Sequence, residues 1–491
     1  MNIVNQPICV HPENKKVFLF REKPYVLVCA TEHYGAVMNR PFDFEKYLAD
    51  AAEKKQTLTR LFVLFREQQS VVNPYSTCKP ESPDYISPFM RTGPGNALDG
   101  QPKYDLSLWN PEFFERLHRF LSIAYRYGII VEIALLSNTY SPEVWALNPM
   151  NSYNNCNDVD EISWMDYTTL RHSKLSSWQA AHIRKIVEET NRYDNIIYEL
   201  CNEPGGGFPG KETYPSTQEV NEWLIWIAGI IRKTEKKLPN QHLIASQEAF
   251  TYEPWLQSSD MAFANFPVDV VNIHPLPGTT YQGKAYDMGT FMSKQLKLQA
   301  VRDYCLATWK EPKPVNLDED NVASQYKDFD GWTIHRKRAW VTLMSGCQYD
   351  YIDFSIINYC EAGTLLSRKY IRTWMKHLSE FIHSMDLVHA HPISGWLQLQ
   401  PAHTLEAVMA SDRLDYCIYL ADNRELGDEG VGSLITGDIV MDLPEGTYHL
   451  SCYSPVTGLY SPALSIQGGP GFHCSLPEFV HDIVVRITKK H

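Results

Sequence analysis

The chain has 491 residues, 44% of them hydrophobic, and a formal net charge of -13. This length exceeds one ordinary domain and fits a barrel of about 250 residues or more together with a smaller domain. The acidic balance and the lack of a Lys/Arg stripe argue against a nucleic-acid partner, and no apolar run is long enough to span a membrane.

Cysteines are numerous but scattered. There are 11, and the two closest in sequence are Cys347 and Cys360, so neither a CxxC motif nor zinc-ligand spacing is present. Scattered thiols favour a reducing, cytoplasmic setting. The first 20 residues lack the basic start and apolar core of a signal peptide, although a secreted protein that has lost its signal would also begin this way.

Short apolar runs rich in β-branched residues alternate with longer amphipathic stretches, which is the pattern of a parallel α/β fold. Near-continuous apolar runs suit strands that are buried on both faces. The predicted strands are YVLVCA from Tyr25, LTRLFVLF from Leu58, IIVEIALL from Ile129, IIYEL from Ile196, HLIAS from His242, VVNIH ending at His274, KPVNLDE from Lys313 and YDYIDF from Tyr349.

The intervening segments have helical spacing of apolar residues. We predict helices over about 173–191, 291–308, 332–344 and 370–383, and a further helix that Ser216 and Glu219 begin with a capping box. Eight strands alternating with helices over about 360 residues predict a closed (β/α)8 TIM barrel. No GxGxxG follows the first strand, so we expect no dinucleotide, and we expect no other cofactor.

Two long segments, 68–109 and 137–172, interrupt this pattern and read as irregular loops. Each follows the carboxyl end of a strand, which is the face where barrels build their sites. They are rich in Tyr and Trp, whose rings could contact a ligand. For any one of these aromatics, packing or anchoring of the loop is the competing interpretation.

The character of the chain changes after about residue 395, where short alternating runs are separated by turn residues such as Pro-Glu-Gly. This pattern predicts a small antiparallel β-sandwich. We therefore divide the chain into a catalytic barrel with an N-terminal β-hairpin, residues 1–390, and an accessory β-sandwich domain, residues 391–491.

Two of the predicted barrel strands end in carboxylates. The fourth strand ends in Asn202 and Glu203 before Pro204, and the seventh ends in Asp318, Glu319 and Asp320. If these strands face each other across the barrel mouth, the two glutamates can work as a pair, one protonated and one ionised. A structural ion pair is the alternative for either residue alone.

These two strings, NEP and P-V-x-x-x-E, lie 116 residues apart when counted from Glu203 to Glu319 and resemble the motifs of clan A glycoside hydrolases. The resemblance covers about residues 20–360 and implies a TIM barrel that acts on carbohydrate. It implies that Glu203 is the general acid/base and that Glu319 is the nucleophile.

The same resemblance extends to three more positions. Arg60 matches the arginine that orients the nucleophile, Asn202 matches the asparagine that binds the sugar 2-hydroxyl, and His274 matches a sixth-strand residue near the nucleophile. A structural ion pair for Arg60 and a satisfied core position for His274 remain the alternatives.

One feature departs from the clan, because the eighth strand reads YDYIDFS and has no Trp at its end. Trp145 or Trp332 could supply the aromatic platform instead. Asp353 could bind a sugar hydroxyl or pair with a core arginine, and His33, at the end of the first strand, could also bind hydroxyls.

A metal site is not expected at Asp318–Asp320, because consecutive strand residues point to opposite faces. Gly205–Gly207 lacks the Lys-Ser/Thr that would make it a phosphate loop.

The sequence thus predicts a retaining β-glycoside hydrolase that acts on β-linked oligosaccharides or glycosides through a covalent glycosyl-enzyme intermediate. The alternatives are a non-catalytic sugar-binding protein on the same barrel and a metal-dependent barrel hydrolase. The sugar, exo against endo action, and the formation of a homo-oligomer stay open.

Overall fold

The computed structural model describes residues 6–31, 36–64, 84–206, 214–251, 255–289, 294–322, 328–352, 365–411 and 414–490. His33 and Asp353, both predicted at the site, lie outside these ranges. Within the described ranges, no helix combines the length and the apolar character that crossing a bilayer requires.

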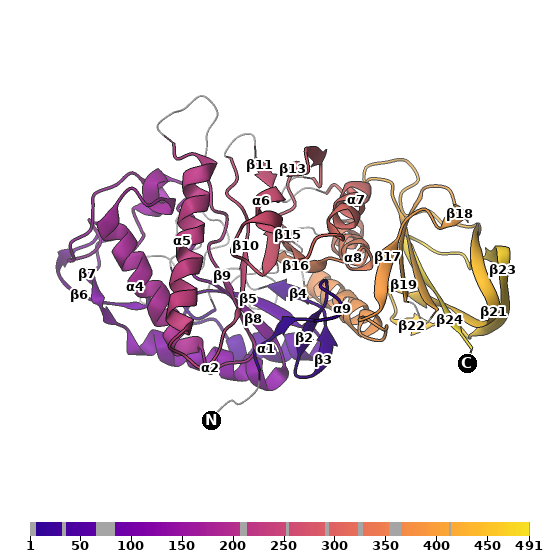
Figure 1. Cartoon of the computed structure of the whole chain (residues 1–491), viewed down its shortest axis with the longest axis horizontal. Coiled ribbons are helices and arrows are strands. Elements are labelled where there is room, and N and C mark those ends of the chain that lie inside the picture. Colours follow the sequence, from indigo (N-terminus) through magenta and orange to yellow (C-terminus); the bar gives the residue numbers. More distant parts are fainter. Residues whose placement is uncertain are drawn as a thin grey trace.

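The described residues form a barrel of eight parallel strands, which confirms the predicted fold (Figure 1). The N–H of Thr57 donates to the Val28 carbonyl at 2.9 Å and joins the first strand to the second, where the sheet closes. In chain order the strands are β4 (Val28–Thr31), β5 (Leu58–Phe62), β8 (Ile130–Ala134), β9 (Ile196–Glu199), β10 (Leu243–Ser246), β12 (Val270–Ile273), β15 (Val315–Val322) and β16 (Gln348–Ile352).

Helices surround the barrel, and the predicted capping box of Ser216 and Glu219 is present at the start of α5. The predicted helix over 291–308 begins only at Leu298, because the N–H groups of Leu296 and Lys297 donate to the distant carboxylate of Glu425. The helices are α1 (Phe44–Glu53), α2 (Pro111–Tyr127), α3 (Pro142–Trp145), α4 (Ser173–Thr190), α5 (Thr217–Glu235), α6 (Asp260–Ala264), α7 (Leu298–Thr308), α8 (Phe329–Met344) and α9 (Leu365–Ile382).

A small antiparallel sheet covers the amino-terminal end of the barrel. It consists of β1 (Cys9–Val10), β2 (Phe18–Phe20) and β3 (Lys23–Tyr25). Its apolar residues, Phe18 among them, pack against the lowest inward-facing side chains of the barrel strands. This sheet lies below the barrel in Figure 1, so that the opposite end of the barrel is the one left for a site.

The expectation that 68–109 is wholly irregular is wrong. Its described part contains β6 (Phe89–Asn96) and β7 (Pro102–Trp109), which pair as an antiparallel hairpin. Proline and glycine at the centre of this hairpin hide the alternation that marks a strand. The other long loop, 137–172, contains α3 and the short 3-10 helix η2 (Trp164–Thr168). Elsewhere in the chain, a second small sheet is formed by β11 (Leu256–Ser258), β13 (Gly278–Tyr281) and β14 (Lys284–Tyr286).

The C-terminal residues form one antiparallel sheet that folds over on itself in the manner of a sandwich. The long strand β21 pairs with β23 from Asp438 to Leu450 and with β18 near its start, and its second half also pairs with β24. The strands are β17 (Ala390–Ile393), β18 (Leu397–Leu399), β19 (Thr404–Ser411), β20 (Asp415–Asp422), β21 (Asp438–Ser454), β22 (Leu459–Tyr460), β23 (Leu464–Ser475) and β24 (Asp482–Lys489).

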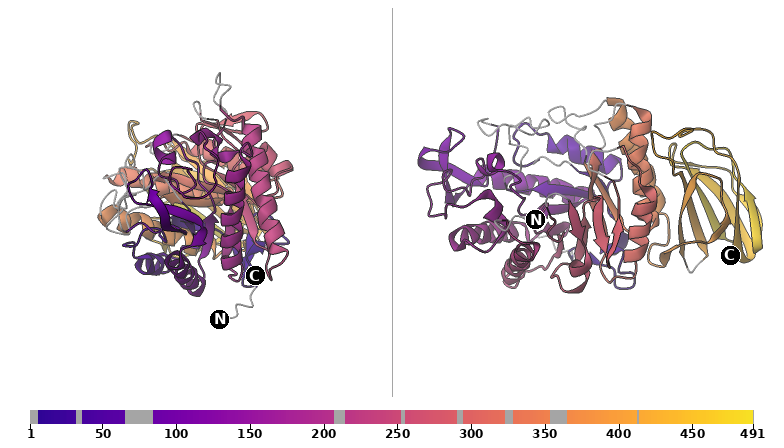
Figure 2. Two further views of the ribbon diagram at one scale, coloured as in Figure 1. Left: turned by 90° about the vertical axis from the view of Figure 1, so that its left-hand side faces the viewer. Right: turned by 90° about the horizontal axis from the view of Figure 1, so that it is seen from above.

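The C-terminal sheet packs against the barrel through α8 and α9, which lie between the two parts (Figures 1 and 2). Trp340 of α8 stacks on Tyr419 of β20 with 5.3 Å between ring centroids. Both rings belong to one apolar cluster that also contains the barrel residues Leu317 and Tyr349. The barrel and the C-terminal sheet therefore share a core.

Candidate active site

Polar side chains occupy the inside of the barrel directly above an apolar floor. Inward-facing residues recur at every second position of a strand. The floor positions are apolar, such as Leu58 and Ile130, and the next inward positions on the same strands are Arg60 and Glu132. The other barrel strands also carry buried polar residues, among them Glu199, Asn272, Asn316, Asp318 and Asp350.

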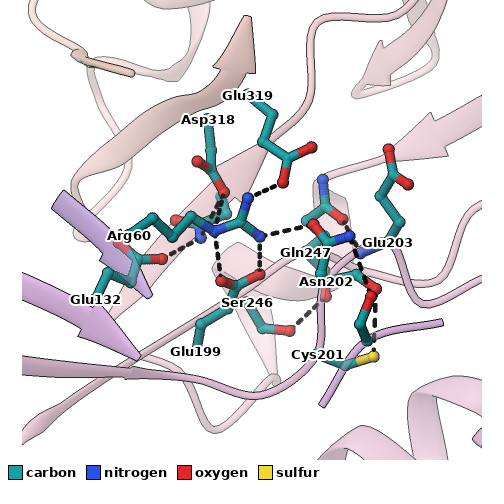
Figure 3. A network of polar contacts seen from close by, with 12 residues as sticks. Arg60, Glu132, Glu199, Cys201, Asn202, Glu203, Ser246, Gln247, Asp318 and Glu319 are labelled. Atoms are coloured by element: carbon teal, nitrogen blue, oxygen red, sulfur yellow. Dashed lines mark hydrogen bonds and ion pairs between the residues drawn. The ribbon is translucent and has the colours of Figure 1, made fainter. Parts of the chain in front are cut away.

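Arg60 is the centre of this polar layer and is 1% exposed. Its guanidinium group binds both oxygens of Glu199, at 2.5 and 2.6 Å, and it also donates to Glu319 and, at 2.7 Å, to the side-chain oxygen of Asn202 (Figure 3). Burial alone would lower the pKa of Arg60, but the carboxylates of Asp318, Glu199 and Glu319 outweigh it and raise that pKa well above its usual value. Arg60 therefore remains a cation.

Glu319 lies in a β-bulge of β15. Leu317 pairs with Tyr349 and Asp320 pairs with Tyr351, so that two residues of β15 oppose one residue of β16. Glu319 has a φ of 50°, in the left-handed region. The simple alternation predicted from the sequence is therefore wrong here, because Asp318 and Glu319 both face Arg60 while Asp320 faces the other side of the sheet.

Glu203 stands opposite Glu319 and is held mainly through its backbone. Its φ is 48°, its N–H donates to the side-chain oxygen of Gln247 at 3.2 Å, and its carbonyl accepts from the side-chain amide of Asn138 at 2.9 Å. The Glu203 side chain is 26% exposed, against 2% for Glu319. Of the two carboxylates, that of Glu203 is therefore the one open to a group arriving from solvent.

The two carboxylates are close enough to act on one atom between them. One oxygen of Glu203, one oxygen of Glu319 and a ring nitrogen of His274 all lie within 4.8 Å of one another. Carboxyl groups about 5–5.5 Å apart allow direct attack by one of them, whereas separations of about 6.5–9.5 Å leave room for a water molecule. The nearest oxygens of Glu203 and Glu319 thus lie within the shorter of these two separations.

His274 connects the pair. Its Nδ1 lies 3.1 Å from Glu203 Oε1 and 3.8 Å from Glu319 Oε2, and its Nε2 lies 3.5 Å from Asp318. Burial alone would lower the pKa of His274, but the surrounding carboxylates, that of Glu319 first, raise it to about 10. The ring is therefore a cation at neutral pH.

This raised pKa makes a prediction about stability. Because the pKa of His274 in the folded protein, about 10, exceeds the usual value of 6.5, its contribution is complete below pH 6.5 and is lost as the pH rises towards 10. We expect the thermal midpoint of His274→Gln to fall less between pH 7 and 10 than that of the wild type. Parallel decreases in a thermal-shift titration of the two proteins would contradict the charged state.

Two further carboxyl groups lie beneath the pair, and their pKa values are shifted in opposite directions. Burial alone would raise the pKa of Asp318, but Arg60 and the ring of His274 lower it to about 2. Burial and the nearby Asp318 and Glu199 raise the pKa of Glu132 well above its usual value, while Asn272 donates to it at 2.6 Å. The pKa of Glu132 is thus raised while that of the neighbouring Asp318 is lowered.

The structure brings Arg60, Asn202, Glu203, His274 and Glu319 together, as the sequence predicts. Trp145 and Trp332, the candidate platforms, lie in apolar clusters instead. Trp145 packs on Tyr167 with centroids 5.5 Å apart, and Trp332 stacks on Tyr370 at 6.0 Å. Their rings are 7% and 3% exposed, so their roles toward a sugar stay predictions without a supporting contact.

Sequence reasoning missed several members of the site. Glu132 and Glu199 are single charged residues inside otherwise apolar strands, and that interruption is a signal that could have found them. Tyr140, whose hydroxyl accepts from the Asn202 amide at 2.7 Å, and Gln247 gave no comparable signal because both lie in loops after strand ends.

A stacked aromatic pair borders the loop that carries Glu203. The N–H of Phe250 donates to the carbonyl of Pro204 at 3.1 Å, and its own carbonyl accepts from Gly206 at 2.8 Å. Trp255 stacks on the Phe250 ring with centroids 5.1 Å apart and is 42% exposed. Trp255 is therefore a partly exposed aromatic residue that stacks on the neighbour of the loop carrying Glu203.

The chain matches a known protein family in sequence, and its fold is similar to those of several solved structures. Residues 88–358 match the family model Cellulase (glycosyl hydrolase family 5). Among solved structures, a glycoside hydrolase family 5 protein from Bacteroides vulgatus ATCC 8482 is similar over 100% of this chain and 94% of its own, with a TM-score of 0.63 at 12% identity. The endo-1,4-beta-mannanase from Rhizomucor miehei is similar over 75% of this chain and 98% of its own, with a TM-score of 0.52 at 15% identity. No curated protein matches the sequence.

Proposed function

Because the chain belongs to glycosyl hydrolase family 5, a member of clan A, we propose that it hydrolyses β-linked oligosaccharides or glycosides with retention of anomeric configuration. The observation that carries the proposal is the approach of the Glu203 and Glu319 carboxylates to within 4.8 Å of each other. That separation admits direct attack on a sugar carbon held between them.

In the first step, an oxygen of Glu319 attacks the anomeric carbon while Glu203 gives its proton to the departing glycosidic oxygen. The bond between the anomeric carbon and that oxygen breaks, and an ester bond to Glu319 forms. In the second step, Glu203 takes a proton from water, whose oxygen attacks the anomeric carbon and releases Glu319.

The surroundings of the pair support this division of roles. Arg60 contacts Glu319 and not Glu203, so it favours negative charge on the attacking residue. Two carboxylates this close do not readily ionise together. His274 lies near both of them, so it is the contact of Arg60 with Glu319 that favours the remaining proton on Glu203. Formation of the ester removes the charge of Glu319, and Glu203 then becomes free to act as a base.

Asn202 is held in place for contact with the sugar. Its side-chain oxygen accepts from Arg60, and its amide donates to Tyr140. We infer that this side chain meets the sugar 2-hydroxyl and that Trp255 offers an apolar ring to the leaving-group side of the substrate. These contacts suit a short β-linked oligosaccharide.

The free cysteines support a cytoplasmic location for this activity. Those whose side chains the structure describes are all free thiols, several of them buried, such as Cys201 and Cys417. We infer a reducing compartment and hence cytoplasmic action on imported saccharides.

The proposal is tested with aryl β-glycosides of the gluco, manno, galacto and xylo series. We expect release of nitrophenol from at least one of them, unaffected by a chelator, and proton NMR should detect the β-anomer of the free sugar before the α-anomer. The α-anomer appearing first would contradict retention. Silence on every glycoside, with measurable oligosaccharide binding, would favour a sugar-binding protein instead.

A further inference from the structure

Helix α8 carries three adjacent cations in its buried middle: Arg336, Lys337 and Arg338. Every residue from Gly331 to Met344 is buried, because the helix lies between the barrel and the C-terminal sheet (Figure 1). Charges are rarely buried without partners. The partners therefore indicate what this helix connects.

The two arginines point to opposite sides. Successive helical residues are about 100° apart, which puts Arg336 and Arg338 about 200° from each other around the axis. Arg336 binds both oxygens of Asp482 on β24 at 2.8 Å, and the Tyr419 hydroxyl also donates to Asp482 at 2.9 Å. This ion pair joins α8 to the C-terminal sheet.

Arg338 turns towards the barrel. It binds both oxygens of Asp320, at 2.7 and 2.8 Å, and also donates to the carbonyls of Met288 and Leu296, both at 2.9 Å. The Arg338 side chain is 1% exposed and that of Asp320 is 4% exposed. Two parallel bonds of this kind fix direction as well as distance.

Asp320 directly follows Glu319 and ends the bulge that turns Glu319 into the barrel. The backbone of Glu319 is in the left-handed region, where a residue other than glycine is held only by its surroundings. On the Glu319 side of the bulge the surroundings are Arg60 and His274, which contact the carboxylate itself. On the other side the surroundings are Asp320 and its fixed partner Arg338.

We propose that Arg338 is a positioning residue for Glu319, acting through Asp320, and that the C-terminal sheet keeps Arg338 in place through the pair of Arg336 and Asp482. The inference rests on the proposed function of Glu319. The C-terminal sheet thereby acquires a role in the chemistry that is separate from any binding of sugar.

The test compares Arg338→Met with Arg372→Met. Arg372 is also 1% exposed, but it pairs with Asp50 of α1 and not with a residue of β15, so its loss removes a buried cation away from the bulge. We expect Arg338→Met to lower kcat for the best aryl glycoside by about 10²-fold, with KM nearly unchanged, because a displacement of about 1 Å costs this much. Arg372→Met should change kcat by less than about threefold.

A second measurement separates positioning from mere loss of structure. A 2-deoxy-2-fluoro aryl glycoside labels the nucleophile covalently, and mass spectrometry gives the rate at which the folded enzyme is labelled. We expect slow labelling in Arg338→Met, intermediate labelling in Arg338→Lys, and a smaller decrease in Asp482→Asn. In Arg338→Met, the Asp320 carboxylate beside Glu319 has lost the positive charge of its arginine and should also move the acid limb of the kcat/KM profile to higher pH.

Equal labelling rates in the Arg338 and Arg372 variants would overturn the inference. If Arg338→Met does not fold, Arg338→Lys, which keeps the buried charge but not the two-point contact, decides by the same comparison. Should Glu319→Ala itself remain active, the proposed function fails, and that outcome is distinguishable from failure of the positioning role.

Discussion

Replacing Glu319 by alanine is expected to lower kcat/KM by a factor of the order of 10⁵ on every substrate that the enzyme accepts. The reason is that no other group can form the ester, since the Glu203 carboxylate is engaged with His274 on the opposite side of the site. The fold should survive, because Arg60 keeps Glu199 and Asp318 as partners when Glu319 is removed. Steady-state kinetics and circular dichroism measure the two effects.

Azide provides the positive control for this variant. The shortened side chain leaves space beside the anomeric carbon, and azide can attack there while Glu203 protonates the leaving oxygen. We expect an α-glycosyl azide from a β-glycoside. As a matched variant, Glu248→Ala removes another buried glutamate, which accepts from the Ala262 N–H at 2.7 Å, and should leave kcat/KM within about an order of magnitude. A Glu319→Ala protein with near-normal turnover would exclude the nucleophile assignment.

Replacing Glu203 by alanine should produce a loss that depends on the leaving group. For an oligosaccharide, whose leaving oxygen needs a proton, kcat/KM should fall by about 10³–10⁴-fold. For a dinitrophenyl glycoside, whose leaving group needs none, the first step should be nearly normal, and kcat should fall because water is no longer deprotonated. A burst of dinitrophenol followed by slow turnover is the expected trace.

Here too azide distinguishes the roles. Azide needs no base, so it should accelerate the second step of Glu203→Ala and give a β-glycosyl azide, the opposite anomer to that from Glu319→Ala. Glu203→Asp, which keeps an acid on a shorter chain, should lie between the two extremes. An equal loss on activated and unactivated glycosides would show that Glu203 does not donate the proton.

The barrel could be predicted from the sequence because its strands are defined locally. Each strand is a short run of apolar, mostly β-branched residues, and such runs are buried on both faces wherever helices cover a parallel sheet. The strand ends then placed Glu203 and Glu319 on the same face. Where the pattern is interrupted by proline and glycine, as in the hairpin of β6 and β7, the local signal failed.

The site was predictable only as far as strand ends reveal it. Trp145 and Trp332 were reasonable platforms by composition, yet both rings pack into the protein interior. Glu132 and Glu199 each interrupt an apolar strand, but the sequence does not show that both lie beside Arg60, which only the closed barrel brings about. Their importance lies in contacts between strands that are far apart in the chain.

The amino-acid sequence alone determined the alternation of strands and helices, the change to an antiparallel sheet and the two carboxylates at strand ends, because each depends on neighbouring residues. The tertiary structure decided the bulge that turns Asp318 and Glu319 the same way, the cation at His274 and the clamp of Arg338 on Asp320. These features depend on the packing and the electrostatic interactions of residues from several strands. No local sequence pattern predicts which distant charged residues will lie close together.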